Sequence, residues 1–155
     1  MNFSTEQEEF WAGDFGNKYI ERSKEKDLVS SNLNFFIKAL RNTIKISSCI
    51  EFGANIGLNL MALKLLFPKI NLKGIEINPK ACMELSNFIG KENVINKSIF
   101  DTKIETKSDL VLIKGVLIHI NPKRLDTVYQ KLYDASNNYI LIGEYYNPVP
   151  VSVNY

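Results

Sequence analysis

The amino-acid sequence predicts an α/β domain with a doubly wound, mostly parallel sheet, preceded by a helical N-terminal segment. After that segment, short apolar runs alternate with longer helical stretches, an order typical of right-handed strand–helix–strand units. Two of the runs, 110–113 and 140–142, contain only apolar residues, as strands buried on both faces of a parallel sheet require. These observations favour a single domain, with a helical prefix over 1–44, a ligand-binding core over 45–146 and an extended tail over 147–155.

Composition and charge exclude several classes of protein. The chain has 155 residues, 45% of them hydrophobic and 23% charged, which fits one compact domain rather than a disordered chain. A net charge of +2 is too small to predict a nucleic-acid partner or an anionic membrane. We expect no signal peptide and no membrane span, because the N-terminus is acidic and polar residues interrupt the longest apolar stretch. Cys49 and Cys82 lie in apolar segments without a CxxC motif, so we expect a cytoplasmic protein without a metal site.

The N-terminal segment is expected to form three helices. Thr5 followed by Glu8 is a capping box, which predicts a short helix ending near Trp11. Glycines then break the pattern, and a second helix is expected over 17–22. After a polar linker, apolar residues at helical spacing predict a third helix over 31–42.

Five strands and three helices are expected in the core. The strands are expected at 48–52, 72–77, 93–99, 110–113 and 139–143. The helices between them are expected at 58–67, 79–89 and 122–135. Asn-Pro pairs open the last two helices, because asparagine is a good N-cap and proline fits the first helical turn.

The turn after the first strand is the first candidate for ligand contact, because ligands of open parallel sheets bind at the carboxyl ends of the strands. It begins at Glu51 and runs Gly53, Ala54, Asn55 to Gly57. Asn55 replaces the second glycine of the dinucleotide fingerprint, which disfavours a nicotinamide cofactor. The spacing of the acid and the two glycines resembles motif I of class I S-adenosylmethionine-dependent methyltransferases. That resemblance implies that this turn binds the cofactor; a purely structural glycine turn is the alternative.

Two further strand ends match the adenosyl site of that class. Glu76 ends the second strand, with Ile77 beside it, and its carboxylate could accept hydrogen bonds from the ribose hydroxyls. After the third strand, Asp101 stands where the resemblance implies a contact with the adenine amino group, and Ile99 and Phe100 could contact the ring. The alternatives are a solvated glutamate at a strand end and a loop aspartate that makes an Asx turn.

The sequence after the fourth strand carries Lys114 and His119. Lys114 is expected at the carboxyl edge of the sheet, facing the methyl group of the cofactor, where it could also pair with a carboxylate or phosphate of the acceptor. His119 is the only histidine, and its ordinary pKa suits a general base that takes a proton from a hydroxyl or ammonium group. A packed structural histidine is the alternative.

The segment after the fifth strand begins with Glu144. Because the fourth and fifth strands are expected to end at the same sheet edge, this segment should converge with His119 around the acceptor. Glu144 could take part in catalysis by orienting a hydroxyl or ammonium group. Aromatic and polar side chains beside it could bind a sugar, namely Tyr145, Tyr146 and Asn147.

Aromatic residues of the N-terminal segment could form a lid over the cofactor. Trp11, Phe15 and Tyr19 are four residues apart and would lie together on a continuous helix, and Arg22 follows Tyr19 by three. A lid that excludes water would strengthen electrostatic interactions in the site, so Trp11, Tyr19 and Arg22 are candidate cofactor contacts. Ordinary packing of an amphipathic prefix is the alternative.

A narrower resemblance covers nearly the whole chain. Four segments resemble the pseudaminic acid biosynthesis-associated methylases: 7–22, EFGANIGLNL at 51–60, KGVLIHINP at 114–122 and EYYNP at 144–148. The resemblance implies methyl transfer from S-adenosylmethionine to an oxygen or nitrogen of a small, polar, sugar-derived acceptor of the nonulosonic (pseudaminic) acid pathway.

One feature departs from the class. Class I methyltransferases normally continue into a hairpin of sixth and seventh strands, and no such strands are expected in 147–155. The edge of the fifth strand would then need another cover, such as a second copy of the chain. A noncatalytic partner that binds S-adenosylmethionine but has lost its acceptor site is therefore the alternative to an active methyltransferase.

Overall fold

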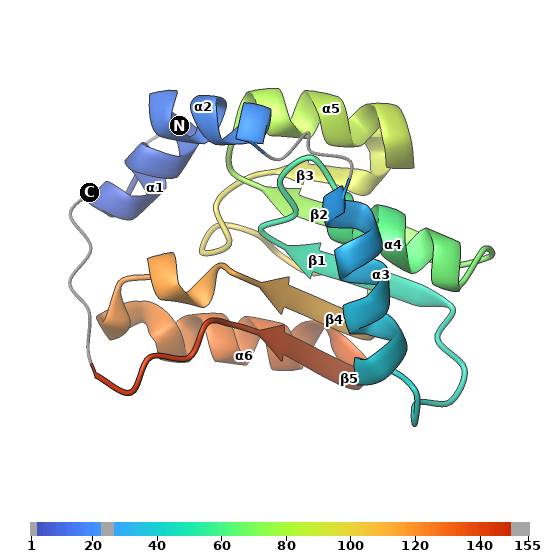
Figure 1. Ribbon diagram of the computed structural model, residues 1–155. Coiled ribbons are helices and arrows are strands. Elements are labelled where there is room, and N and C mark those ends of the chain that lie inside the picture. The colour runs from blue at the N-terminus through green and yellow to red at the C-terminus, as the bar shows by residue number, and fades with distance from the viewer. Residues whose placement is uncertain (1–2, 23–26, 150–155) are drawn as a thin grey trace.

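The computed structural model describes residues 3–22 and 27–149, and its centre is a five-stranded parallel sheet (Figure 1). The strands are β1 (Ser48–Phe52), β2 (Asn71–Glu76), β3 (Val94–Asn96), β4 (Ser108–Lys114) and β5 (Ser136–Gly143). Their order across the sheet is β3-β2-β1-β4-β5, and every pair is parallel. The chain therefore winds outward from β1 in both directions, which confirms the predicted doubly wound sheet and puts its switch point between β1 and β4.

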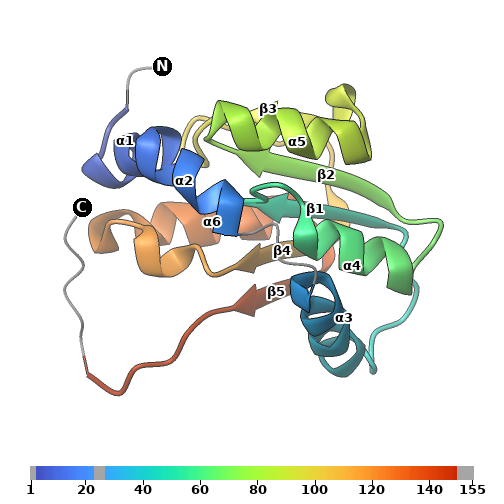
Figure 2. The same ribbon diagram turned by 45° about the horizontal axis from the view of Figure 1, so that its top comes forward.

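Helices cover both faces of this sheet, and two more lie over one end of it (Figures 1 and 2). The α-helices are α1 (Glu6–Ala12), α2 (Asp14–Arg22), α3 (Asp27–Ala39), α4 (Leu58–Leu66), α5 (Pro79–Ile89) and α6 (Leu125–Ala135). Three short 3-10 helices are η1 (Lys91–Asn93), η2 (Leu117–His119) and η3 (Pro122–Arg124). Helices α3, α4 and α5 pack on one face, α6 packs on the other, and α1 and α2 lie near the carboxyl ends of the strands.

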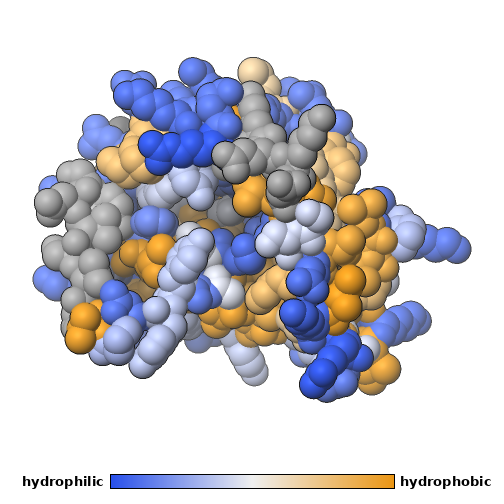
Figure 3. Space-filling view, viewed as in Figure 1, coloured by the Kyte–Doolittle hydropathy of each residue, from blue (hydrophilic) through white to orange (hydrophobic). Residues whose placement is uncertain are grey.

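The core consists of two apolar layers, one on each side of the sheet. Alternate strand residues such as Leu110 and Leu112 join the layer beneath α3, α4 and α5. Their neighbours Val111 and Ile113 join the layer beneath α6. All four side chains are fully buried, and each contributes about 1.5–3 kcal/mol through the hydrophobic effect. In the space-filling view, exposed apolar side chains also gather over α3 and α4 (Figure 3).

Several element boundaries differ from those predicted. Helix α2 begins at Asp14 rather than at residue 17, and α3 ends at Ala39 rather than at residue 42. Strand β3 ends at Asn96, because the chain then turns and the Ser98 carbonyl accepts hydrogen bonds from two amides that follow it. Strand β5 begins three residues early, at a shifted register opposite β4. Residues 23–26 of the expected linker, and the expected tail after residue 149, lie outside the described residues.

Candidate functional site

A cavity of about 510 Å³ lies at the carboxyl ends of the strands. Its walls come from the turns after β1 and β2, the loops after β3 and β4, the end of β5, and helices α1, α2, α3 and α4. The volume falls within the range of small-molecule and cofactor sites, and the switch point between β1 and β4 is where ligands of doubly wound sheets bind.

The turn after β1 presents its backbone to the cavity. Gly53 has φ +77°, and a Cβ there would lie 2.6 Å from the Val116 side chain, so only glycine fits. The amides of Gly53 and Ala54 donate hydrogen bonds to the Ile75 carbonyl. Gly53, Ala54 and Asn55 line the cavity, whereas Gly57 is buried behind it, where a Cβ would lie 2.6 Å from the Leu85 side chain.

Glu76 lies at the cavity edge with its carboxylate already oriented. One oxygen, Oε2, accepts a hydrogen bond from the Asn55 amide at 2.7 Å, and Oε1 accepts one from the Asn78 amide at 2.8 Å. The side chain is only 8% exposed, and this burial raises its pKa while the backbone amides oppose the shift. Each oxygen keeps a second lone pair, so the carboxylate can still accept a ligand hydroxyl. Ile77, the next residue, also lines the cavity.

Glu51 is buried below the cavity rather than in its wall. Its Oε1 accepts a hydrogen bond from Asn59 Nδ2 at 2.6 Å, and its Oε2 has no partner within the part of the chain that the structure describes. Burial raises the pKa of Glu51 to about 8, although the Asn59 hydrogen bond and the charge of Lys114 oppose the shift. Asn59 and Lys114 both line the cavity, so they connect this buried acid with the site.

We predict that Glu51→Gln reduces the pH dependence of stability. Between pH 4.5 and about 8 the folded protein holds a proton on Glu51 that the unfolded chain releases, so the free energy of unfolding should fall as the pH rises through this range. Glutamine removes that proton equilibrium. Urea unfolding at pH 5 and pH 8 should therefore give a smaller decrease for Glu51→Gln than for the wild type. Exposed Glu105→Gln serves as the control, and equal decreases in all three proteins would contradict the prediction.

The loop after β3 supplies an apolar wall. Ile99 and Phe100 both line the cavity. The guanidinium carbon of Arg124 lies 3.8 Å from the centre of the Phe100 ring, which fixes the outer face of that ring by a cation–π contact. Asp101 is exposed and does not line the cavity, so its predicted contact with adenine would need the loop to move.

The exit from β4 brings Lys114 and His119 into the same cavity. Lys114 is half-buried, with its Nζ 5.9 Å from the centre of the Phe35 ring. His119 ends η2, and its ring lies 4.6 Å from the Trp11 ring, centre to centre. Burial lowers the pKa of His119, which keeps the imidazole neutral at physiological pH and able to accept a proton.

Glu144 holds the loop that leads to His119. Its Oε1 accepts hydrogen bonds from the amides of Val116 and Leu117, both at 2.9 Å. The other oxygen, Oε2, is buried and has no hydrogen-bond partner among the described residues, although Glu144 lines the cavity. Tyr145 lines the cavity at its mouth and is 83% exposed. Tyr146 and Asn147 are exposed and stand outside it.

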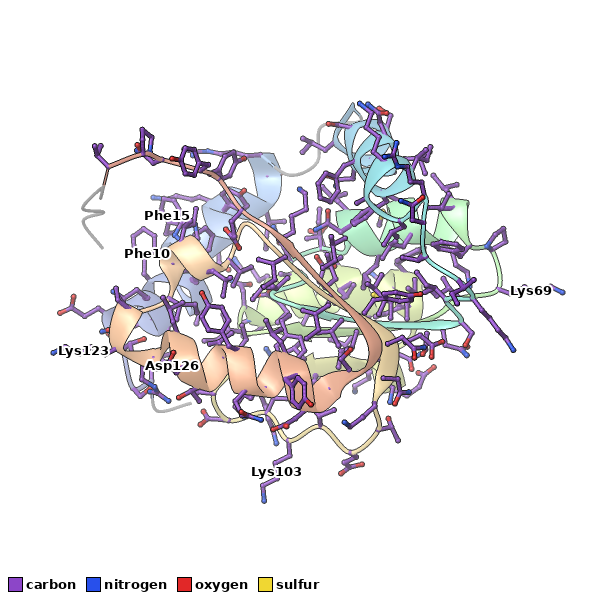
Figure 4. All side chains as sticks on the ribbon, turned by 90° about the horizontal axis from the view of Figure 1, so that it is seen from below. Phe10, Phe15, Lys69, Lys103, Lys123 and Asp126 are labelled. Carbon is purple, nitrogen blue, oxygen red and sulfur yellow. The ribbon has the colours of Figure 1, made fainter. Side chains whose placement is uncertain are left out.

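Helices α1 and α2 form the expected aromatic cluster over the cavity. The Trp11 ring meets the rings of Phe15 and Tyr19 edge to face, with centres 5.3 and 5.2 Å away. The rings of Phe10 and Phe15 stack with their centres 4.1 Å apart. Figure 4 labels both residues near one another, on α1 and α2. Trp11 and Tyr19 line the cavity, whereas Arg22 is exposed and does not. The four aromatic side chains of α1 and α2 thus lie together despite the helix break at residue 13.

Sequence reasoning missed three contributors to the site. Asn78 was expected only as a helix cap, yet its side chain also reaches α1 and α2. Asn59 binds the buried Glu51, and Arg124 stacks on Phe100 and donates a hydrogen bond to Ser4. Asn78 and Arg124 join segments far apart in the sequence, and Asn59 reaches back across the turn after β1; no spacing rule indicates such contacts.

Neither a metal centre nor a membrane-spanning helix is found among residues 3–22 and 27–149. No group of three or more histidine, cysteine or acidic side chains there could hold a metal ion. No helix in this part of the chain has the length and apolar character that crossing a membrane requires.

Several solved structures that superpose on this chain are methyltransferases. The plantazolicin methyltransferase BpumL, crystallised with S-adenosylhomocysteine, superposes with a TM-score of 0.69 at 16% sequence identity over 88% of this chain and 56% of its own. The sugar N-methyltransferase from Streptoalloteichus gives a TM-score of 0.70 at 15% identity, with the same coverage of both chains. The DesVI protein of Streptomyces venezuelae gives 0.68 at 11% identity, over 88% and 59%.

The likeness to these proteins shows a class I methyltransferase fold. No protein-family profile matches the sequence. No curated protein matches it either. The chain spans a little over half the length of the first two solved proteins.

Proposed function

We propose that the protein transfers a methyl group from S-adenosylmethionine to an oxygen or nitrogen atom of a small polar acceptor. The observation that carries the proposal is the buried carboxylate of Glu76. The amides of Asn55 and Asn78 hold it at the cavity edge, beside the close backbone approach at Gly53. An acid at the end of β2, beside an open first turn, fits the two ribose hydroxyls of an adenosyl group.

The other walls of the cavity fit the rest of such a ligand. Ile99 and Phe100 would contact the adenine ring, and the Gly53–Asn55 backbone would face the amino-acid part. S-adenosylmethionine supplies an activated methyl group, so the protein's main contribution is to orient the acceptor and exclude water. His119 would take the proton that the acceptor loses, because its imidazole is neutral and lies at the cavity wall.

We also propose that the acceptor is a sugar of the nonulosonic acid type, free or activated by a nucleotide. The resemblance to the pseudaminic acid-associated methylases supports this choice, as does the fold shared with a sugar N-methyltransferase. Lys114 would pair with the acceptor carboxylate or phosphate, while Glu144 and Tyr145 would contact its hydroxyl or amino groups. Tyr146 and Asn147 could join them only if the segment after β5 folds inward. Such chemistry fits a cytoplasmic location. The two buried cysteines form no disulfide, which fits the same location.

A ligand comparison tests the cofactor class. We expect S-adenosylhomocysteine to raise the melting temperature and NAD to leave it unchanged, because a ligand that binds only the folded state stabilises it. Stabilisation by NAD alone would contradict the proposal. A methyl-transfer assay with labelled S-adenosylmethionine, run against free and nucleotide-activated nonulosonic acids, then tests the acceptor.

A noncatalytic partner that binds S-adenosylmethionine is the second candidate. Tyr146 and Asn147 were expected to bind the acceptor but are exposed and do not line the cavity. The acceptor side of the cavity therefore lacks two of its expected side chains, which supports this candidate. Binding of S-adenosylhomocysteine without methyl transfer to any acceptor of the panel would favour this candidate.

We further predict self-association through β5. Within the described residues β5 pairs with β4 alone, and Ile140 and Ile142 on the α6 side of this edge are 40% and 47% exposed. An unpaired apolar edge is normally covered. Light scattering should therefore give a mass above that of one chain, and Ile142→Lys should shift the mass toward the monomer. Lys69→Glu, on the exposed turn between α4 and β2, is the control and should leave the mass unchanged; a monomeric wild type would refute the prediction.

A further inference from the structure

The lid made by α1 and α2 meets the core through one small apolar cluster, one ring contact and a few hydrogen bonds. Its apolar anchor is a small cluster of buried Ile20, Ile56 and Ala81, with Leu58 packed against it. The layer beneath α3, α4 and α5 is much larger and includes Phe36, Leu60 and Leu63 among its fully buried members. A segment with so little apolar burial opens at a lower free energy than the core, so the hydrogen bonds that hold it decide whether it stays closed.

Asn78 makes the central polar contact between lid and core. Its side chain is 3% exposed and uses both ends of its amide group. Oδ1 accepts hydrogen bonds from the amides of Lys80 and Ala81 and so caps the N-terminus of α5. Nδ2 donates to the Trp11 carbonyl and to Asn17 Oδ1, both at 3.1 Å. One amide therefore caps the start of α5 and binds a carbonyl at the end of α1, where helices leave carbonyls without partners.

The backbone of the same residue touches the candidate cofactor carboxylate. The Asn78 backbone amide donates a hydrogen bond to Glu76 Oε1 at 2.8 Å. The Asn78 side chain binds the carbonyl of Trp11, and the Trp11 ring lies against His119. Gly16 makes room for this junction, because a Cβ there would collide with the Trp11 carbonyl and lie 2.8 Å from Asn78 Nδ2. The contacts from Glu76 to Trp11 are thus continuous through a single residue.

We infer that Asn78 is a positioning residue: its side chain latches the lid over the cavity and links ligand binding at Glu76 to the position of Trp11. The latch itself follows from the contacts of Asn78. The link to a ligand rests on the proposed function, because it requires that an adenosyl ligand binds at Glu76.

Asn78→Asp isolates the latch. An aspartate oxygen can still accept from the amides of Lys80 and Ala81, so the cap of α5 is kept. The second oxygen replaces an N–H donor and would face the Trp11 carbonyl and Asn17 Oδ1, two acceptors that repel it. Asn93→Asp is the matched control, because Asn93 Nδ2 also donates to a backbone carbonyl, that of Ile89, at the other end of α5.

Hydrogen exchange and the fluorescence of Trp11, the sole tryptophan, report on the lid directly. In Asn78→Asp we expect the amides of α1 and α2 to exchange about tenfold faster or more, while those of β1 and β4 keep their wild-type rates. The Trp11 emission should shift to longer wavelength as the ring meets water. Asn93→Asp should leave both signals unchanged. Lid exchange in Asn78→Asp equal to that in Asn93→Asp would overturn the latch.

The same measurement with a bound ligand tests the link between ligand binding at Glu76 and the position of Trp11. Saturating S-adenosylhomocysteine should slow exchange in α1 and α2 of the wild type, and most of this slowing should be lost in Asn78→Asp. Equal slowing in both proteins would overturn the link while leaving the latch in place. If the wild type does not bind S-adenosylhomocysteine, the proposed function fails, and the ligand-free comparison still decides on the latch.

Gly16→Ala gives an independent test from the lid side. The added methyl group would collide with the Trp11 carbonyl and crowd Asn78 Nδ2 at the same junction, while the Asn78 side chain that caps α5 is kept. If amide hydrogen exchange in Asn78→Asp becomes faster throughout the core as well, the exchange of Gly16→Ala alone decides whether the latch exists. Faster exchange confined to α1 and α2 supports the latch, and unchanged lid exchange overturns it.

Discussion

Glu76→Ala should weaken binding of S-adenosylhomocysteine by about 1.5–3 kcal/mol, or roughly 10- to 150-fold in Kd. The substitution removes the charged acceptor that we place under the ribose hydroxyls. It also leaves the amides of Asn55 and Asn78 without the carboxylate that orients them, so the turns after β1 and β2 lose a shared anchor. Isothermal titration calorimetry of wild type and variant measures the change directly.

Two comparisons separate the loss of a ligand contact from a loss of fold. Glu105→Ala removes an exposed carboxylate far from the cavity and should bind as the wild type does. Glu76→Gln keeps one acceptor oxygen and should fall between the wild type and Glu76→Ala. A Kd for Glu76→Ala that matches the wild-type value would remove Glu76 from the ligand site.

His119→Ala should reduce turnover by roughly 10²–10⁴ while leaving the affinity for S-adenosylhomocysteine nearly unchanged. The reason is that a neutral imidazole in the cavity wall can take the proton released by the acceptor, whereas the methyl donor is already activated. Single-turnover methyl transfer, measured beside calorimetric binding, separates the two effects.

The pH profile gives a second test of the same residue. Burial lowers the pKa of His119 from its ordinary value, so the wild-type rate should stay level through neutral pH and fall at acidic pH. In His119→Ala this acidic limb should disappear. Full turnover in the variant would assign His119 to packing against Trp11, and a variant that melts early and loses the ligand would point the same way.

The order of strands and helices could be predicted from local patterns, because central strands buried on both faces must be apolar, and β1, β2 and β4 are each followed by a helical stretch. The caps of α5 and of the helical stretch after β4 were also predictable, because an Asn-Pro pair caps a helix through contacts within its first turn. The position of the cavity follows from this topology, since the turns after β1 and β2 must meet at one sheet edge.

Other features depend on tertiary contacts that local rules do not contain. The sequence predicts that Gly16 interrupts a helix, yet Gly16 lies within α2. A side chain at this position would collide with the Trp11 carbonyl, so the packing of the two helices requires glycine here. Glu144 was predicted as a catalytic group, and the structure shows its carboxylate binding the amides of Val116 and Leu117 across the sheet edge. Whether it also meets the acceptor is a question for the methyl-transfer assay, with Glu144→Gln as the variant that keeps the loop contact.

Helices α1 and α2 leave the ribosome well before the segments that they contact. The Trp11 carbonyl binds a side chain 67 residues further on, and Ser4 binds one 120 residues further on. At 5–20 residues per second, synthesis of these intervening stretches takes about 3–24 s. Throughout this interval the aromatic side chains of α1 and α2 have no cavity to cover. During synthesis, α1 and α2 are therefore open to chaperones and proteases until the segments that they contact have been made.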